Sequence, residues 1–365
     1  MKSYFSCLLL MCLACGHAKS ETKPKTSDSV IDSLTIPAIP EWTDRYADGK
    51  KGDVRFFNLS EVMRRFKVDR LGAVEIQNTY RDLTRANPKM AGDQGLMAAV
   101  KRVQEGRLES GVVRDELEKA PFIVVFDLDE TLYDQYYGGG DACHSVAYAR
   151  SNGKMKYIHM VPGWAETIRS LVKMGGRVVL FSANLDKTTL DNLAQIKLDG
   201  QPLTNSPLIS GIMTNSHLTQ QEKTEAPGSP EKPRKGRPVV EPSKDLRHFD
   251  PTLERVIIVD DNPLRLFQFQ NIRVFKKFHA DKYCKTTDPV VKSSYERAMS
   301  VVVDEIKETV GYMKANANTT FKIAYLPYTP LGQTAMTFLM TGQTWTADQA
   351  RAYLRKNPSI VDKRY

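Results

Sequence analysis

Three apolar runs of the same kind constrain the fold of this chain more than any other feature. The runs FIVVF, RVVLF and RVIIV stop at the polar residues Asp127, Ser182 and Asp260. Continuous β-rich runs of this length are typical of strands that are buried on both faces. Segments with helical spacing, 163–175 and 184–196, lie between them. Strands that alternate with helices predict an α/β fold with a mostly parallel sheet and right-handed crossovers.

The polar residues that end the three runs predict where the functional site lies. In an open α/β sheet, ligands bind beyond the carboxyl ends of the strands. We therefore expect a Rossmann-like parallel sheet flanked by helices, with its site at this edge. Two strand-like segments flank Asn152-Gly153, a strong two-residue turn signal, which predicts a small β-hairpin flap above the site.

Composition shifts divide the 365 residues further. Residues 59–118 show helical spacing interrupted at Gly106 and Gly111, and residues 222–242 are rich in Pro, Gly and basic residues, as in a mobile loop. Helices are predicted at 293–313 and 346–356, with Thr346 as the N-cap. The predicted parts are a signal peptide (1–18), a flexible tether (19–40), a helical N-terminal lead-in (41–119), the α/β domain (120–285) and a helical C-terminal extension (286–365).

The first residues, MKSYFSCLLLMCLACGHA, have the plan of an export signal. Lys2 precedes an apolar stretch that is too short to remain as a membrane-spanning helix. MCLAC resembles a bacterial lipobox, which would end the signal at residue 14 and place a lipid anchor on Cys15, although Cys12 stands where leucine is usual. Ordinary cleavage after Ala18 is the alternative. We expect export to the periplasm or the outer membrane, or secretion, with lipidation favoured.

Charge and cysteine content limit the other possibilities. The net charge of +9 indicates a generally basic surface, and no zinc-finger spacing or basic helix accompanies it, so we expect no nucleic-acid partner. If Cys15 carries lipid, Cys143 and Cys284 are the cysteines left in the folded part. An oxidising compartment would allow these two to pair, and two free buried thiols are the alternative.

Carboxylates gather at the predicted site. In an extended segment, Asp127 and Asp129 project to the same side and Leu128 to the other. Two carboxylates this close repel one another unless a cation lies beside them, and Mg²⁺ takes oxygen ligands and bridges to substrate phosphate. Asp260 and Asp261 add carboxylates from the end of the third run. Lys244 and Ser182 would supply a positive charge and a hydroxyl donor for phosphoryl oxygens.

Together these motifs resemble the four-motif signature of the haloacid dehalogenase superfamily of phosphotransferases. The branch they resemble is the NLI-interacting-factor-like, or C-terminal-domain phosphatase, group, whose small β insertion corresponds to the Asn-Gly hairpin. The resemblance covers about residues 120–280. The matching motifs are DLDETL (Asp127–Leu132), FSANL (Phe181–Leu185), KDL (Lys244–Leu246) and VDDNP (Val259–Pro263).

The resemblance implies catalytic roles. Asp127 attacks phosphorus and forms an aspartyl-phosphate. Asp129 protonates the leaving oxygen and then activates water for the second step. Thr131 orients the aspartate loop, while Ser182, Lys244 and backbone amides stabilise the charge on the transferring group.

The resemblance also implies ligands. Mg²⁺ is held by Asp127, the carbonyl of Asp129 and Asp261, and Asp260 supports the ion or Lys244. The partner is a phosphorylated substrate, either a small phosphomonoester or a phosphoprotein. Contacts to the substrate are implied at Ser182, Ala183, Asn184 and Lys244.

Two other functions remain open. Class C acid phosphatases are bacterial surface lipoproteins of the same superfamily, and the export signal and VPGWAE (Val161–Glu166) resemble them. A broad range of phosphomonoester substrates would favour that group. The second alternative is a non-catalytic module that binds a phosphorylated ligand without turnover, and the intact set of acids with Lys244 argues against it.

Overall fold

The structure is a computed structural model that describes residues 59–90, 92–137, 143–150, 152–219 and 243–362. The predicted signal peptide, the tether, the loop 222–242 and the first part of the lead-in, 41–58, lie outside the described residues.

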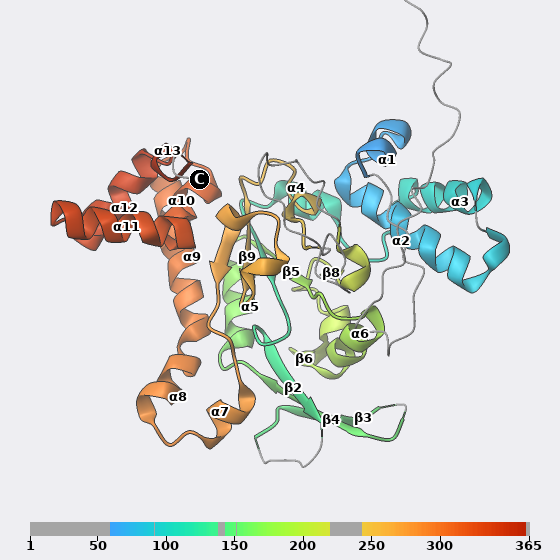
Figure 1. Ribbon diagram of the computed structural model, residues 1–365, viewed down its shortest axis with the longest axis horizontal. Helices are drawn as coiled ribbons and strands as arrows, with labels where there is room; N and C mark the ends of the chain where they lie inside the picture. The colour runs from blue at the N-terminus through green and yellow to red at the C-terminus, as the bar shows by residue number, and fades with distance from the viewer. Residues whose placement is uncertain (1–58, 91, 138–142, 151, 220–242, 363–365) are drawn as a thin grey trace, which may run out of the picture. The chain divides into compact units, whose positions relative to one another are not determined.

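A parallel sheet forms the centre of the described chain (Figure 1), and its strand order is β10-β9-β1-β5-β8. The three apolar runs are adjacent strands, because β1 pairs with β5 on one side and with β9 on the other. Phe126, the last residue of β1, lies opposite Leu180 and Val259, so the three polar stops share one edge. The predicted α/β fold is therefore confirmed. The strands are β1 (Ile123–Phe126), β5 (Arg177–Phe181), β8 (Ile212–Met213), β9 (Val256–Asp260) and β10 (Ile272–Val274).

Helices cover both faces of this sheet (Figure 1). Val124 and Phe126 of β1 belong to one core cluster, which includes residues of α5 (Trp164–Lys173), α6 (Asp186–Gln195) and α9 (Ala298–Ala315). Ile123 and Val125 belong to the opposite cluster, with residues of α2 and α4. This alternation follows from the two-residue period of a strand, and it explains why the run must be apolar throughout.

The lead-in is helical from residue 59, as predicted. Asp69 caps α2, and its side chain accepts a hydrogen bond from the backbone N–H of Gly72 at 2.7 Å. Gly106 and Gly111 have positive φ angles of 79° and 64°, a conformation open to glycine, and both lie in the break between α3 and α4, as expected. The helices are α1 (Leu59–Phe66), α2 (Arg70–Ala86), α3 (Asp93–Gln104) and α4 (Arg114–Lys119).

The flap is larger than predicted. The hairpin around Asn152-Gly153 is present as β3 (Val146–Ala149) and β4 (Met155–Met160). A further strand, β2 (Tyr133–Tyr137), pairs with β4, which gives the order β2-β4-β3. The sequence YDQYY of β2 has no apolar alternation, so its strand state depends on pairing with β4.

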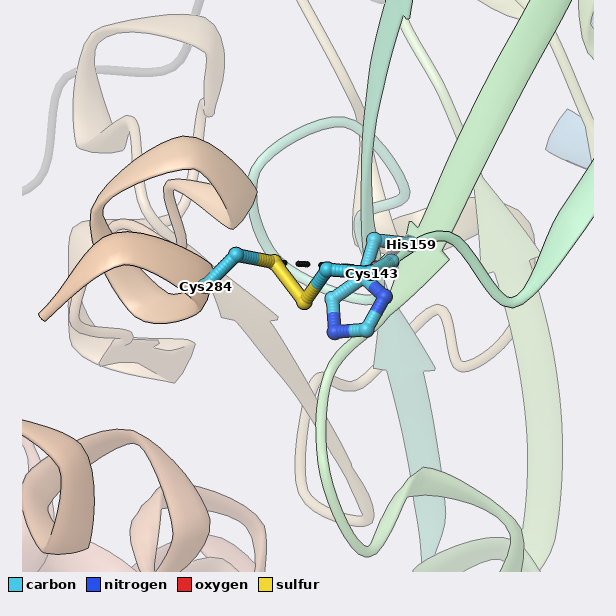
Figure 2. Close-up of side chains that lie close together, drawn as sticks. All are labelled: Cys143, His159 and Cys284. Carbon is cyan, nitrogen blue, oxygen red and sulfur yellow. Dashed lines mark hydrogen bonds between the residues drawn. A yellow bond between two sulfur atoms is a disulfide. The ribbon is translucent and has the colours of Figure 1, made fainter. Parts of the chain in front are cut away.

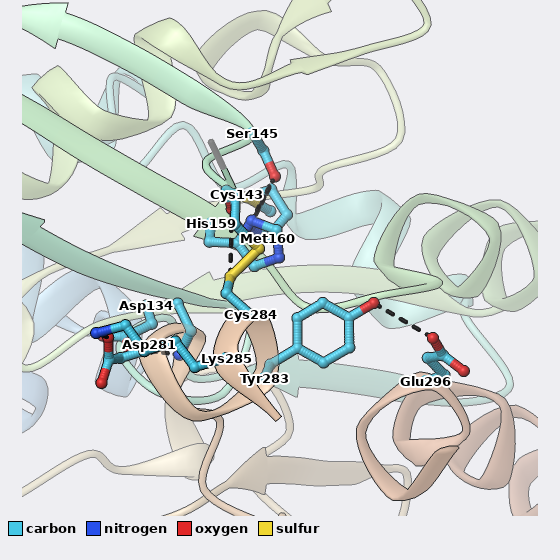
Figure 3. Close-up of a disulfide and its surroundings, with 11 residues drawn as sticks. Asp134, Cys143, Ser145, His159, Met160, Asp281, Tyr283, Cys284, Lys285 and Glu296 are labelled. Atoms are coloured by element: carbon cyan, nitrogen blue, oxygen red, sulfur yellow. Dashed lines mark hydrogen bonds and ion pairs between the residues drawn. A yellow bond between two sulfur atoms is a disulfide. The ribbon is translucent and has the colours of Figure 1, made fainter. Parts of the chain in front are cut away.

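The flap is attached to the rest of the domain through α7 (Ala280–Lys285). Cys143 and Cys284 form a disulfide with a Cα–Cα distance of 5.9 Å, which settles the alternative left open by the sequence (Figure 3). The backbone N–H of Ala280 donates to Asp134 Oδ2 at 2.8 Å, so β2 also contacts the start of α7. Two contacts, one covalent, therefore fix the flap to this helix.

The C-terminal extension is helical, with one correction. The helix predicted at 293–313 is two helices, α8 (Pro289–Glu296) and α9, with a break at Arg297 that no Gly or Pro announces. Thr346 caps α12 as predicted, accepting from the Gln349 backbone N–H at 3.3 Å. Within the described ranges, no helix is long and apolar enough to cross a membrane. The remaining helices are α10 (Phe321–Tyr325), α11 (Pro330–Gln343), α12 (Ala347–Lys356) and α13 (Ser359–Asp362).

Short elements complete the chain. They are β6 (Lys197–Leu198), β7 (Gln201–Pro202), and the 3₁₀ helices η2 (Pro88–Met90), η3 (Leu203–Asn205), η4 (Asn215–His217), η5 (Leu246–His248), η6 (Pro263–Arg265), η7 (Phe269–Asn271) and η8 (Leu326–Tyr328).

Candidate active site

The carboxyl ends of β1 and β9 bring three aspartates together. Asp127 follows β1 directly, and its backbone N–H donates to the Val259 carbonyl at 2.9 Å. Side-chain oxygens of Asp127, Asp260 and Asp261 lie within 4.8 Å of one another, a spacing at which one metal ion can be held. A set of carboxylate oxygens suits a hard divalent cation. Asp129 lies outside this group, so its own side chain is not among the clustered ligands.

Lys244 provides the positive charge of the site. Its side chain is 1% exposed, and Nζ contacts Asp127 and donates to Asp260 Oδ2 at 2.7 Å. Burial lowers the pKa of Lys244, but the two carboxylates outweigh this effect and the pKa is raised. Burial and the charge of Asp260 raise the pKa of Asp127 well above its usual range, against the effect of Lys244. One ammonium thus faces two buried acids, and a divalent cation would complete the charge balance.

Asp129 is held at both carboxylate oxygens. Ser182 Oγ donates to Oδ2 at 3.1 Å, and the side-chain amide of Gln135 donates to Oδ1. Ser182 is fully buried and its Oγ also accepts from the Asn184 backbone N–H at 2.9 Å. Burial raises the pKa of Asp129, while the hydrogen bond from Ser182 lowers it. The Ser182 hydroxyl therefore joins Asp129 to the backbone of Asn184.

A buried lysine of the flap also acts on Asp129. Lys156 of β4 is fully buried, and its charge interacts with the carboxylate of Asp129. Burial lowers the pKa of Lys156 to about 8, against the opposite effect of Asp129. The flap therefore contributes charge to the site.

Thr131 joins the two loops that carry the acids. Its hydroxyl donates to Asp261 Oδ1 at 3.1 Å and accepts from the Asp261 backbone N–H at 3.0 Å. The preceding residue, Glu130, has a φ of 61°, in the left-handed region that non-glycine residues seldom adopt. Strained residues of this kind cluster at functional sites, where the surrounding structure holds them.

A cavity of about 320 Å³ opens over these groups. Ala183 and Asn184, which the sequence placed in substrate binding, line it together with Lys244, whereas Ser182 lies behind them. Two cationic side chains at the cavity, Arg265 and Lys277, were missed by the sequence reasoning. The other lining residues are Asp127, Asp129, Glu130, Gln135, Asp260, Asp261 and Asn262.

A second group of potential metal ligands contains two cysteines, but it does not have the properties of a metal site. Cys143, His159 and Cys284 lie together at the base of the flap (Figure 2). The two sulfur atoms are bonded to each other, and metals bind cysteine as the free thiolate. Figure 2 shows the His159 ring beside the disulfide.

The aspartates and the lysine at this sheet edge are arranged as expected for a phosphatase of the haloacid dehalogenase type. Residues 122–301 match the family model of NLI interacting factor-like phosphatase, so this region of the chain has the domain of that family. The resemblance inferred from the motifs is therefore confirmed, and the helices before residue 122 lie outside the matched region.

The solved structures to which the chain is similar include two of Fcp1. One is the structure of Fcp1 described as an essential RNA polymerase II CTD phosphatase. Its sequence is 11% identical, the TM-score is 0.38, and the match covers 65% of this chain and 74% of that chain. The other is Fcp1 of fission yeast bound to beryllium fluoride, with 10% identity, a TM-score of 0.31, and coverage of 68% and 70%. No curated protein matches the chain significantly.

Proposed function

We propose that this phosphatase is a Mg²⁺-dependent phosphomonoester hydrolase that acts through an aspartyl-phosphate. The observation that supports it best is Lys244, which contacts the expected nucleophile Asp127 and Asp260 at the same edge where Asp261 joins them. This arrangement supports the proposal because Lys244, the expected nucleophile and the expected metal ligands line a single cavity. When bound by these acids, Mg²⁺ neutralises charge on the phosphoryl group.

The reaction has two steps on this chain's own residues. A carboxylate oxygen of Asp127 attacks phosphorus, and the bond to the leaving oxygen breaks as Asp129 gives that oxygen a proton. Asp129, now ionised, then takes a proton from water, which attacks the aspartyl-phosphate and releases phosphate. Lys244 stabilises negative charge on the transferring group.

The experiment is a phosphatase assay with p-nitrophenyl phosphate and Mg²⁺. Asp127→Asn should lower kcat by about 10³-fold or more, because an amide cannot form the acyl phosphate. Asp199→Asn is the matched control, since Asp199 lies on the surface in an ion pair with Arg169 and its side chain is 53% exposed. Turnover by Asp127→Asn close to wild type would contradict the mechanism. Binding of a phosphorylated ligand by a wild-type protein without turnover would favour the binding module.

The substrate class is tested by a screen over small phosphomonoesters and phosphopeptides. Preference for phosphoserine peptides would favour a protein phosphatase. A broad phosphomonoester range would favour the class C acid phosphatase alternative.

We propose further that the protein is exported from a bacterial cell and anchored by lipid at Cys15. The signal-like residues 1–18 support export, and so does the Cys143–Cys284 disulfide, because such bonds persist in oxidising compartments. Mass spectrometry of the mature N-terminus tests the proposal. An acylated Cys15 supports anchoring, an N-terminus at Lys19 supports plain secretion, and an intact Met1 in a cytoplasmic fraction contradicts both.

A further inference from the structure

A chain of buried and partly buried hydrogen bonds runs from the flap to Asp129. The hydroxyl of Tyr148 donates to Asn192 Oδ1 at 2.7 Å. Asn192 Nδ2 donates to Gln135 Oε1 and to the Tyr133 hydroxyl, each at 3.0 Å. The amide nitrogen of Gln135 then donates to Asp129 Oδ1. Three elements meet in this chain, since Tyr148 lies on β3, Gln135 on β2 and Asn192 on α6.

The bonds of this chain run in one direction while Asp129 is ionised, the state in which it activates water. An ionised carboxylate only accepts, so Gln135 then turns its NH₂ toward Asp129 and its carbonyl toward Asn192. Asn192 must then turn its own NH₂ toward Gln135, which leaves its carbonyl to accept from Tyr148. Asn192 is fully buried, so a reversed amide would have no water to satisfy it. With Asp129 ionised, the side-chain amides of Gln135 and Asn192 can therefore each adopt one orientation only.

We propose that Gln135 is a positioning residue for Asp129 and that Asn192 holds Gln135 in place. Ser182 and Gln135 donate to different oxygens of Asp129, and together they fix the plane of its carboxylate. Proton transfer to a leaving oxygen depends strongly on such alignment. This inference rests on the proposed function, in which Asp129 protonates the leaving group.

The flap takes part in this arrangement through Tyr148. Its hydroxyl reaches Asn192 from β3, the strand at the outer edge of the flap sheet. The outer strand of the flap is thereby linked to Asp129 through Asn192 and Gln135.

The dependence of rate on the leaving group separates positioning from general damage. p-Nitrophenolate leaves with little help from an acid, whereas an alkoxide needs a proton. Gln135→Met keeps the length of the side chain and removes the donor. We expect kcat/KM, which reports the step in which the leaving group departs, to fall by about ten-fold more on an alkyl phosphate than on p-nitrophenyl phosphate, because general acid catalysis contributes roughly 10²–10⁴-fold and part of that depends on alignment.

Gln135 lines the cavity and could affect substrate directly, so a second variant is needed. Asn192 is not among the cavity residues, and Asn192→Leu should reproduce the same split between the two substrates. Tyr148→Phe removes only the hydroxyl that donates to Asn192, so the difference in loss between the two substrates should be smaller. Because this change is mild, it still tests the proposal if Asn192→Leu fails to fold. The double variant of Gln135 and Asn192 should lose little more than Gln135→Met alone, because the two residues act in series.

Equal losses on the two substrates in a folded, active Gln135→Met protein would overturn the positioning role and leave the proposed function intact. Additive losses in the double variant would overturn the link through Asn192. A wild-type protein inactive on both substrates would overturn the proposed function, and the positioning role with it.

Discussion

The hydroxyl of Thr131 and the backbone and side chain of Asp261 form a two-way contact, with Thr131 donating to Oδ1 at 3.1 Å and accepting from the Asp261 N–H at 3.0 Å. Thr131 is fully buried and follows β1, while Asp261 follows β9. The loops after the two strands are thus fixed to each other by one side chain. A threonine in this position orients an expected metal ligand without being a ligand itself.

Thr131→Val should therefore weaken metal binding. Valine has the same shape but cannot make either hydrogen bond, and partners that orient metal ligands contribute about 10–100-fold to metal affinity. The Mg²⁺ concentration for half-maximal activity should rise within that range, while Thr131→Ser should stay close to wild type. A Mg²⁺ titration of the three proteins measures this. An unchanged requirement in Thr131→Val would show that Asp261 is oriented by other groups.

The buried imidazole of His248 should make the free energy of unfolding depend on pH. The imidazole is 4% exposed, and within the described residues neither ring nitrogen has a hydrogen-bond partner. Burial lowers the pKa of His248 from 6.5 to about 4, against the effect of Asp245, while Arg70 and His217 lower it further and Glu75 raises it. The folded state therefore favours the neutral ring more than the unfolded state does.

The sign of the effect follows from this difference. Above pH 6.5 the ring is neutral in both states, so its contribution to stability is fully present. As the pH falls from 6.5 to about 4, protonation of the unfolded state removes that contribution. The loss is on the order of 3 kcal/mol. Urea unfolding at several pH values should show a shallower decline for His248→Leu than for wild type.

The sequence was informative where one element determines its own structure. The strands β1, β5 and β9 were predicted because each apolar run is buried on both faces whatever its partners are. Asp127, Lys244 and Asp260 were found because their motifs are local. The strand β2 was missed because its state depends on pairing with β4. The break at Arg297 was missed because packing, and no helix-breaking residue, divides α8 from α9.

The supporting residues of the site were missed for a related reason. Gln135 contacts Asn192 across 57 residues of sequence, and Arg70 contacts Asp245 across 175. No local pattern marks such pairs, because each residue type is common on a protein surface. Sequence reasoning thus found the groups expected to react and missed those that hold them.

The Cys143–Cys284 disulfide should stabilise the folded protein substantially. It closes a loop of 141 residues and joins the flap to α7. Removing a cross-link of this kind costs about 2–4 kcal/mol, with long loops toward the upper end. The double variant Cys143→Ser, Cys284→Ser should therefore unfold at a lower temperature than the oxidised wild type. A reducing agent should lower the melting temperature of the wild type and leave that of the variant unchanged, and a reductant effect on both would assign the loss to another cause.

The last prediction concerns the helical lead-in, which lies outside the matched family region. Arg70 at the start of α2 donates to Asp245 Oδ2 at 2.6 Å, and Asp245 directly follows Lys244 in the chain. The Asp245 carboxylate is fully buried and also accepts from Arg247. Arg70→Ala removes one of its two arginine partners, so the loop that carries Lys244 should lose part of its support.

Because Lys244 is expected to hold a phosphoryl oxygen, Arg70→Ala should raise KM and weaken inhibition by inorganic phosphate more than it lowers kcat. The loss of stability should be about 2 kcal/mol, below the 3–5 kcal/mol of a fully broken buried pair, since Arg247 remains. Arg85→Ala is the matched control on the same helix, because the ion pair of Arg85 with Asp82 is exposed. Steady-state kinetics with phosphate as inhibitor, alongside thermal unfolding, compare the two variants. Unchanged phosphate inhibition in Arg70→Ala would show that the lead-in stabilises the domain without positioning Lys244.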